Sequence, residues 1–291
     1  MKTILYGNGV NLLVGAPKWD NLLVKVDNTW HSSKSLLCIT PPNTIQYDQL
    51  ELTSNTSSKK LLDNLCLTIS GPWKNLIYEQ LANMCDVNFL TTNYDLTLES
   101  YFASPSKIGK EVILNLFSYY CKEHNDTEKG NGVSLYGKGN IWHIHGDIMR
   151  PDSIILGYNH YCKQITKIRE YIPSLYVSQL LSSYGSRHVV GGEWSGKSWI
   201  DLFFRSDVFI LGLGLGFAEL DLWWILDLWA RCKKAKLVSN RIVYLDAVCG
   251  MATSCKRPFV RVLHDFGIEY VSQSGSTYME AYEKCLDYIR K

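Results

Sequence analysis

The sequence predicts an α/β fold built on a mostly parallel sheet, with helices on both faces and helical insertions. Short apolar segments of strand length alternate with longer segments of helical periodicity, which is typical of parallel βαβ units. Hydrophobic residues make up 46% of the 291-residue chain, enough for a core on each face of a sheet. We therefore expect a single domain over residues 1–291, with irregular or helical insertions at about 16–85 and 160–205.

Seven segments have the composition of strands, because they are short, apolar and rich in β-branched or aromatic residues. The first of them runs directly into a glycine turn, and the segment 208–211 is apolar throughout, as in a fully buried strand. The expected strands are 3–6, 87–91, 141–145, 154–156, 208–211, 242–245 and 269–271.

Longer segments between these strands repeat their apolar residues with a helical period, most clearly the amphipathic segment 278–290. Residues 16–60 are polar and rich in turn residues, so we expect an irregular insertion there, mobile near 53–60. The expected helices are 61–85 with a break at Gly71-Pro72, 96–102, 111–122, 163–184, 199–204, 219–234 and 278–290.

Charge and cysteine content narrow the class of protein. Lys and Arg number 30 against 28 Asp and Glu, and this net charge of +2 does not indicate a nucleic-acid partner. The nine cysteines are odd in number and include no C-x-x-C pair, which argues against a four-thiolate zinc site and a disulfide framework. We therefore expect no metal, and thiols that are reduced and mostly buried.

No segment predicts export or insertion into a membrane. The first residues lack the apolar stretch of a signal peptide. The most apolar run, 208–230, contains Glu219, Asp221 and Asp227, and three carboxylates make it unsuitable as a membrane span. We expect a cytoplasmic protein without a membrane partner.

Four polar or glycine-rich segments directly follow apolar strands: 7–11, 91–95, 143–147 and 212–221. In an open parallel sheet the carboxyl ends of the strands meet at one crevice, where ligands bind. The segment 91–95 crowds hydroxyl, amide and carboxylate groups into five positions. A ligand site explains this density, and an Asx-turn that caps a following helix is the alternative.

Two side chains at these strand ends suit a reaction. Asn93 does not titrate, so its amide would hold a water molecule or a ribose hydroxyl in position. His145 precedes a glycine that allows close approach of a ligand, and its imidazole can act as a general base near neutral pH. A hydrogen-bonded structural role is the alternative for His145. His143, one step deeper on the same strand face, is expected to be structural or supporting.

Two glycine segments also lie at strand ends. Gly7 and Gly9 would let backbone N–H groups approach a pyrophosphate. Gly212 and Gly214 would let the backbone approach a ribose or a phosphate. Neither segment completes the G-x-G-x-x-G pattern of dinucleotide-binding loops. The alternatives are a tight turn with positive φ at the first segment and a small-residue packing strip at the second.

Residues 191–198 satisfy G-x-x-x-x-G-K-[ST], the pattern of a phosphate-binding P-loop. The context is poor, because the preceding strand would be limited to residues 188–190 and the chain after Ser198 is short for a P-loop domain. ATP binding through Lys197 is therefore the weaker alternative to a glycine-rich loop before the helix at Trp199.

Five segments, taken in order, resemble motifs of the sirtuin (SIR2)-like domain, in particular of its bacterial branch found in antiphage defence systems. Each motif is short, but their order and spacing across most of the chain make the resemblance specific. The segments are 7–11 (GNGVN), 91–95 (TTNYD), 143–146 (HIHG), 156–158 (LGY) and 209–224, which runs from FILGLG to ELDLWW.

The resemblance implies a Rossmann-like NAD-binding fold with a helical insert. It implies that Asn93 and His145 are the catalytic pair, and that NAD is a substrate of the site. Asp95 would lie on the nicotinamide side or support the site structurally. The residues expected to bind NAD are Gly7, Asn8, Gly9, Asn11, Thr92, Asp95, Gly212, Gly214 and Glu219.

Two departures from deacylase sirtuins bear on the reaction. The chain lacks the paired C-x-x-C motifs of their zinc ribbon, and Asn8 and Asn11 replace the alanine and serine of their first motif. Both departures argue against protein deacylation and fit the defence branch, which resembles NAD⁺ glycohydrolases. We expect an enzyme that cleaves NAD⁺ to nicotinamide and ADP-ribose as an abortive-infection effector. The alternatives are a non-catalytic module that senses NAD derivatives and an NAD-dependent protein deacylase.

An unregulated NADase would kill its host, so such an enzyme implies partners. The resemblance suggests a homo-oligomer, in some cases with a HerA-type ATPase or another regulatory chain. Trp223, Trp224 and Trp229 could serve such an interface, with packing in the core as the alternative.

Overall fold

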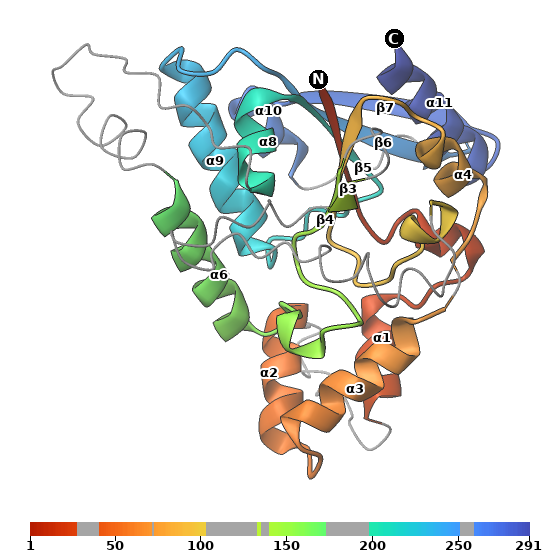
Figure 1. The fold of residues 1–291 in the computed structure, drawn as a ribbon, viewed down its shortest axis with the longest axis vertical. Helices are drawn as coiled ribbons and strands as arrows, with labels where there is room; N and C mark the ends of the chain where they lie inside the picture. The colour runs from red at the N-terminus through yellow and green to blue at the C-terminus, as the bar shows by residue number, and fades with distance from the viewer. Residues whose placement is uncertain (28–40, 72, 103–132, 135–139, 173–197, 251–258) are drawn as a thin grey trace, which may run out of the picture.

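A seven-stranded sheet forms the centre of the structure (Figure 1), a computed structural model that describes residues 1–27, 41–71, 73–102, 133–134, 140–172, 198–250 and 259–291. The strand order is β3-β4-β2-β1-β5-β6-β7. The strands are β1 (Lys2–Tyr6), β2 (Val87–Thr91), β3 (Val133–Ser134), β4 (Asn140–His143), β5 (Asp207–Leu211), β6 (Ile242–Cys249) and β7 (Glu269–Gly275).

Six of the strands are parallel, and the short edge strand β3 pairs antiparallel with β4. Numbered among themselves, the parallel strands run 3-2-1-4-5-6 across the sheet, which is the order of a doubly wound dinucleotide-binding fold. The chain reverses its direction of winding between β1 and β5. The predicted α/β fold with a mostly parallel, Rossmann-like sheet is confirmed.

Helices cover both faces of the sheet (Figure 1), because successive strand residues point to opposite sides and both sides are apolar. In β1, Ile4 packs on one side and Leu5 on the other. The first side is covered by α4 (Leu76–Ala82) and α11 (Tyr278–Arg290). The second is covered by α6 (Tyr158–Tyr171), α8 (Trp199–Arg205), α9 (Leu220–Lys234) and α10 (Val260–Asp265).

The expectation of an irregular segment at 16–60 is wrong for its described part. That part contains α1 (Trp19–Val26), α2 (Asn43–Thr53) and the start of α3 (Ser58–Ile69), which lie together at one end of the molecule (Figure 1). One of the polar residues that indicated a loop is a helix cap here: the Ser57 hydroxyl accepts a hydrogen bond from the backbone N–H of Lys60.

The expected strand at 154–156 is also wrong. These residues follow a 3₁₀ turn, η5 (Pro151–Ser153), and the side chains of Ile154 and Leu156 are buried against the N-terminal helices. The backbone N–H of Ile155 donates to the carbonyl of His145, so the segment lies beyond the end of the sheet. Strand β4 correspondingly ends at His143, two residues earlier than expected.

The expected helix at 96–102 is reduced to a 3₁₀ turn, η2 (Glu99–Tyr101). The Asp95 carboxylate accepts a hydrogen bond from the backbone N–H of Thr97, which is the Asx-turn alternative. A second 3₁₀ turn, η1 (Asn11–Val14), follows β1 and ends at Gly15 with φ 82°. The expected helix 111–122 and all of the P-loop-like stretch except Ser198 lie outside the described residues.

Three expectations about particular residues have mixed outcomes. All six cysteines among the described residues are free thiols. Three of them, Cys66, Cys232 and Cys285, are buried, so half and not most of these thiols lie in the core. Trp229 is buried in the core. Trp223 and Trp224 are half-buried and pack against the same core. Within the described ranges, no helix has the length and apolar character needed to cross a membrane.

Candidate active site

The carboxyl ends of the central strands open onto a pocket of about 960 Å³, at the upper end of the range for small-molecule sites. It lies at the switch point of the sheet, where ligands bind in doubly wound folds. Gly7 is the one expected site residue that does not line it. The expected residues that do line it are Asn8, Gly9, Asn11, Thr92, Asn93, Asp95, His145, Gly212, Gly214 and Glu219.

The two glycine segments are bonded to each other across the switch point. The N–H of Gly7 donates to the Leu211 carbonyl at 3.1 Å, and the N–H of Gly9 donates to the Gly212 carbonyl at 2.8 Å. A Cβ at Gly9 would lie 2.5 Å from the same Gly212 oxygen. These N–H groups are already paired, so close strand packing explains Gly7 and Gly9. Neither has the positive φ of the tight-turn alternative, whereas Gly212 has φ 60°.

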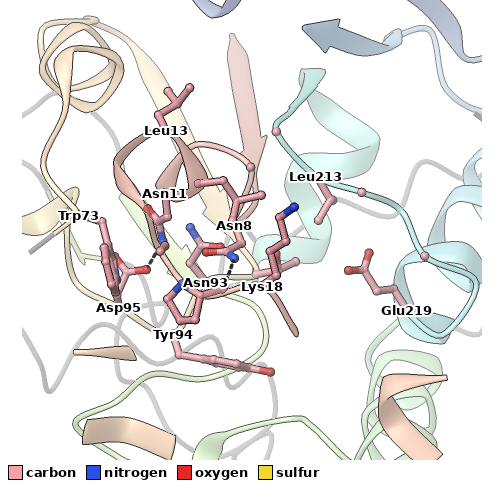
Figure 2. Close-up of a pocket in the computed structure, with 18 of the residues that line it drawn as sticks. Asn8, Asn11, Leu13, Lys18, Trp73, Asn93, Tyr94, Asp95, Leu213 and Glu219 are labelled. Atoms are coloured by element: carbon pink, nitrogen blue, oxygen red, sulfur yellow. Dashed lines mark hydrogen bonds between the residues drawn. The ribbon is translucent and has the colours of Figure 1, made fainter. Parts of the chain in front are cut away.

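Asn93 lies at the start of a hydrogen-bonded chain of polar side chains, of which Figure 2 shows Asn93, Asn11 and Asp95. Its side-chain N–H donates to the Tyr78 hydroxyl at 3.3 Å, which donates to Asn11 Oδ1 at 2.5 Å. Asn11 Nδ2 then donates to Asp95 Oδ2 at 2.7 Å. An ionised carboxylate only accepts, so Asp95 sets the direction of every bond in the chain. The amide oxygen of Asn93 and its second N–H are therefore left for a ligand.

Asp95 anchors that chain from a buried position. Burial raises the pKa of Asp95, and hydrogen bonds from Thr97 and Asn11 oppose this rise, while the Glu99 charge adds to it. Because its side chain is engaged by Asn11 and Thr97, Asp95 orients the neighbouring amides.

The buried ring of His143 is hydrogen-bonded to the backbone of Asn93. Its Nδ1 is 2.9 Å from the Asn93 carbonyl oxygen, and its Nε2 is 2.7 Å from Glu99 Oε1. Both partners accept hydrogen bonds, so both ring nitrogens donate and the ring is an imidazolium. Burial lowers the pKa of His143, but the charge and hydrogen bond of Glu99 outweigh burial and raise it to about 9.

We expect the buried His143–Glu99 ion pair to make the free energy of unfolding fall as the pH rises into the mildly basic range. The pKa of His143 is raised to about 9 in the fold, so its contribution is complete below the unfolded value of about 6.5 and is lost as pH rises through 9. The loss should be on the order of 3 kcal/mol between about pH 6 and about pH 9.5, measured by denaturant unfolding.

The test variant is Glu99→Gln. Its matched control is Glu79→Gln, at an exposed position of α4. Glu99→Gln removes the charge that raises the pKa of His143, so the fall with pH should shrink, whereas Glu79→Gln should keep the wild-type dependence. An unchanged pH dependence in Glu99→Gln would show that the ion pair does not set it.

His145 follows β4 and pairs with a carboxylate from another element. Its Nε2 lies 3.0 Å and 3.3 Å from the two oxygens of Asp221, which is fully buried in the first turn of α9. The carboxylate accepts from Nε2, so in the neutral ring Nδ1 is the nitrogen that can take a proton. Burial lowers the pKa of His145, but the charge and hydrogen bond of Asp221 and the charge of Glu219 outweigh burial and raise it.

Glu219 and Lys18 bring charge to the pocket from two further segments (Figure 2). Glu219 immediately precedes α9, and burial raises the pKa of Glu219 to about 7, with His145 opposing and Asp221 adding to the rise. Lys18 is the N-cap residue of α1 and the only Lys or Arg among the described residues that line the pocket.

Sequence reasoning missed several residues that complete the site: Tyr78, Glu99, Asp221 and Lys18. Asp221 carried a usable signal, because a carboxylate inside an apolar helical run needs a partner. Tyr78 and Glu99 carried none, since an aromatic or acidic residue in a helical pattern is ordinary.

A comparison with known protein families matches the part of the chain that carries several of these residues. No curated protein matches the sequence. The family model described as the SIR2-like domain matches residues 87–190, less than half of the chain, and this range includes Asn93, Asp95 and His145. The chain therefore contains a SIR2-like domain over residues 87–190.

Proposed function

We propose that this protein is an NAD⁺ glycohydrolase, which cleaves NAD⁺ to nicotinamide and ADP-ribose. The SIR2-like domain supports a function that involves NAD. The observation that supports hydrolysis is that one pocket is lined both by the oriented amide of Asn93 and by His145, whose ring is paired with Asp221. An amide that positions water and a base that accepts a proton suffice for this reaction.

Cleavage of NAD⁺ needs few further groups in the site. The C1′–N bond of NAD⁺ is already activated by the cationic nicotinamide, which leaves with the bonding electron pair. The sugar becomes an oxocarbenium-like cation, and water held by the Asn93 amide oxygen adds to C1′. The proton released by that water passes to Nδ1 of His145, and Asp221 stabilises the imidazolium that forms.

The dinucleotide would lie along the carboxyl ends of the strands. Because the N–H groups of Gly7 and Gly9 are engaged within the fold, we assign the pyrophosphate to Lys18 and the Asn8 side chain, which line the pocket. Gly214 has open space around its Cβ position and lets the ligand approach the backbone.

Purified protein and NAD⁺, without any peptide, test the proposal. We expect nicotinamide and ADP-ribose to appear in equal amounts, measured by liquid chromatography. A deacylase would instead release nicotinamide only when an acyl-lysine peptide is added. A sensing module would bind NAD⁺ in calorimetry and release none, and either result would overturn the glycohydrolase assignment.

The wider role that we propose is abortive infection in antiphage defence, by a cytoplasmic homo-oligomer that a HerA-type ATPase or another chain regulates. The family resemblance supports this role. The NAD⁺ content of cells that express the protein, with and without phage challenge, is the corresponding measurement in vivo.

A further inference from the structure

Three ionisable side chains gather beside one end of the pocket: His145 and Glu219 line it, and the buried Asp221 contacts His145. The carboxylate of Asp221 is engaged, because it accepts hydrogen bonds from His145 Nε2 and from the backbone N–H of Leu222. Glu219 differs, since its Oε2 is buried and has no hydrogen-bond partner among the described residues. Glu219 also lines the pocket, so its carboxylate borders the space where a ligand would lie.

A buried acceptor without a donor is unfavourable, and a ligand in the adjoining pocket that brings donors to this carboxylate would offset the cost. Figure 2 shows the carboxylate of Glu219 turned from the start of α9 toward the cavity, on the side across from Asn93. The nearby Tyr94 hydroxyl cannot serve, because it already donates to the Ile155 carbonyl at 2.9 Å. The vicinal hydroxyls of a ribose are donors of the right kind for a carboxylate.

We propose that Glu219 is a further catalytic residue, whose carboxylate accepts hydrogen bonds from the hydroxyls of the nicotinamide ribose and stabilises positive charge on that sugar. This inference rests on the proposed NAD⁺ glycohydrolase function. As the C1′–N bond breaks, its electron pair leaves with nicotinamide, and water then bonds to C1′ and gives its proton to His145. Glu219 forms no covalent bond and acts through its charge, which matters most in the cationic transition state.

The charges around Glu219 make this role depend on pH. His145 faces it from the end of β4, Asp221 from α9, Tyr94 from the segment after β2 and Tyr161 from α6. The pKa of Glu219 is raised to about 7, so the carboxylate is ionised above that pH and protonated below it. The rate of NAD⁺ hydrolysis should therefore rise with pH through about 7.

The test compares Glu219→Gln and Glu219→Asp with wild type, and uses Glu170→Gln at an exposed position of α6 as the control. Glu219→Gln keeps the shape and removes the charge, so kcat should fall roughly tenfold to a hundredfold. The midpoint of its pH–rate profile should move to lower pH, because His145 loses a nearby negative charge. Glu219→Asp should keep the wild-type pH dependence with an intermediate kcat, and Glu170→Gln should match wild type.

Thermal melting and binding of carba-NAD, a non-hydrolysable analogue, show whether each variant is folded with an intact pocket. An unchanged kcat and pH profile in a folded Glu219→Gln would overturn the inference while the proposed function stands. A rise in KM alone would also overturn it, because the charge would then act on binding and not on the transition state. Wild-type protein that binds carba-NAD but releases no nicotinamide from NAD⁺ would overturn both.

Discussion

His145→Gln is expected to lower the rate of NAD⁺ hydrolysis about a thousandfold, the size typical of a lost general base. The new amide can still donate a hydrogen bond to Asp221, but it cannot accept the proton of the attacking water. His145→Ala is the harsher change, because it leaves the fully buried Asp221 carboxylate unpaired, at a cost of about 3 kcal/mol or more. The measurement is nicotinamide release under single-turnover conditions, with thermal melting as the check on folding.

Asp221→Asn separates two effects of Asp221 on His145. The carboxylate raises the pKa of the ring, and it stabilises the imidazolium that forms in the reaction. Removing its charge lowers the pKa of His145, so the base form persists to lower pH and the midpoint of the pH–rate profile should move down. The plateau rate should fall about tenfold, because the imidazolium is less well stabilised. Asp227→Asn is the matched control on the same helix, since that carboxylate pairs with Arg231 at the surface. Wild-type rates in a folded His145→Gln protein would exclude an imidazole base from the mechanism.

The six parallel strands and their polar ends were predictable, because both are local properties of the sequence. An apolar run such as 208–211 has few alternatives to a buried strand, and the residues that follow it must lie at the edge of the sheet. Asn93 and His145 were placed in one crevice by that rule alone, and both line the pocket.

The partners of these residues were not predictable, because they come from distant elements. Asp221 reaches His145 from 76 residues away, and Tyr78 reaches Asn11 from 67 residues away. Such pairings depend on how helices pack on the sheet, which a hydrophobic pattern does not specify. The missed helix α2 has a different cause: its apolar and polar residues are weakly segregated, so its helical period is faint.

The glycines show how a correct position can have a different physical reason. Gly9 was expected to bring N–H groups to a pyrophosphate, yet its own N–H is bonded to Gly212 and a Cβ there would collide with the facing backbone. The glycines keep the ends of β1 and β5 close at the switch point, where Gly9 and Gly212 line the pocket. In our proposal, contact with the ligand therefore comes from side chains such as Asn8, which lines the pocket.

Asn93→Ala is expected to lower NAD⁺ hydrolysis about 300-fold, since the amide oxygen that positions the attacking water is removed. The fold should tolerate the change at a cost of about 1 kcal/mol, because Tyr78 keeps its own bond to Asn11 and no donor is left buried without a partner. Asn83→Ala, at the exposed end of α4, is the matched control and should behave as wild type.

Tyr78→Phe tests whether the hydrogen-bonded chain orients this amide. The variant keeps Asn93 but removes the acceptor of its N–H group, so the amide can rotate, and the rate should fall about tenfold. If Asn93 and His145 act on the same water, the double variant Asn93→Ala with His145→Gln should be no slower than the slower single variant, because residues that act as a unit are not additive. A fully additive loss would mean that the amide and the imidazole act on different steps, and Asn93 would then be assigned to holding the ribose.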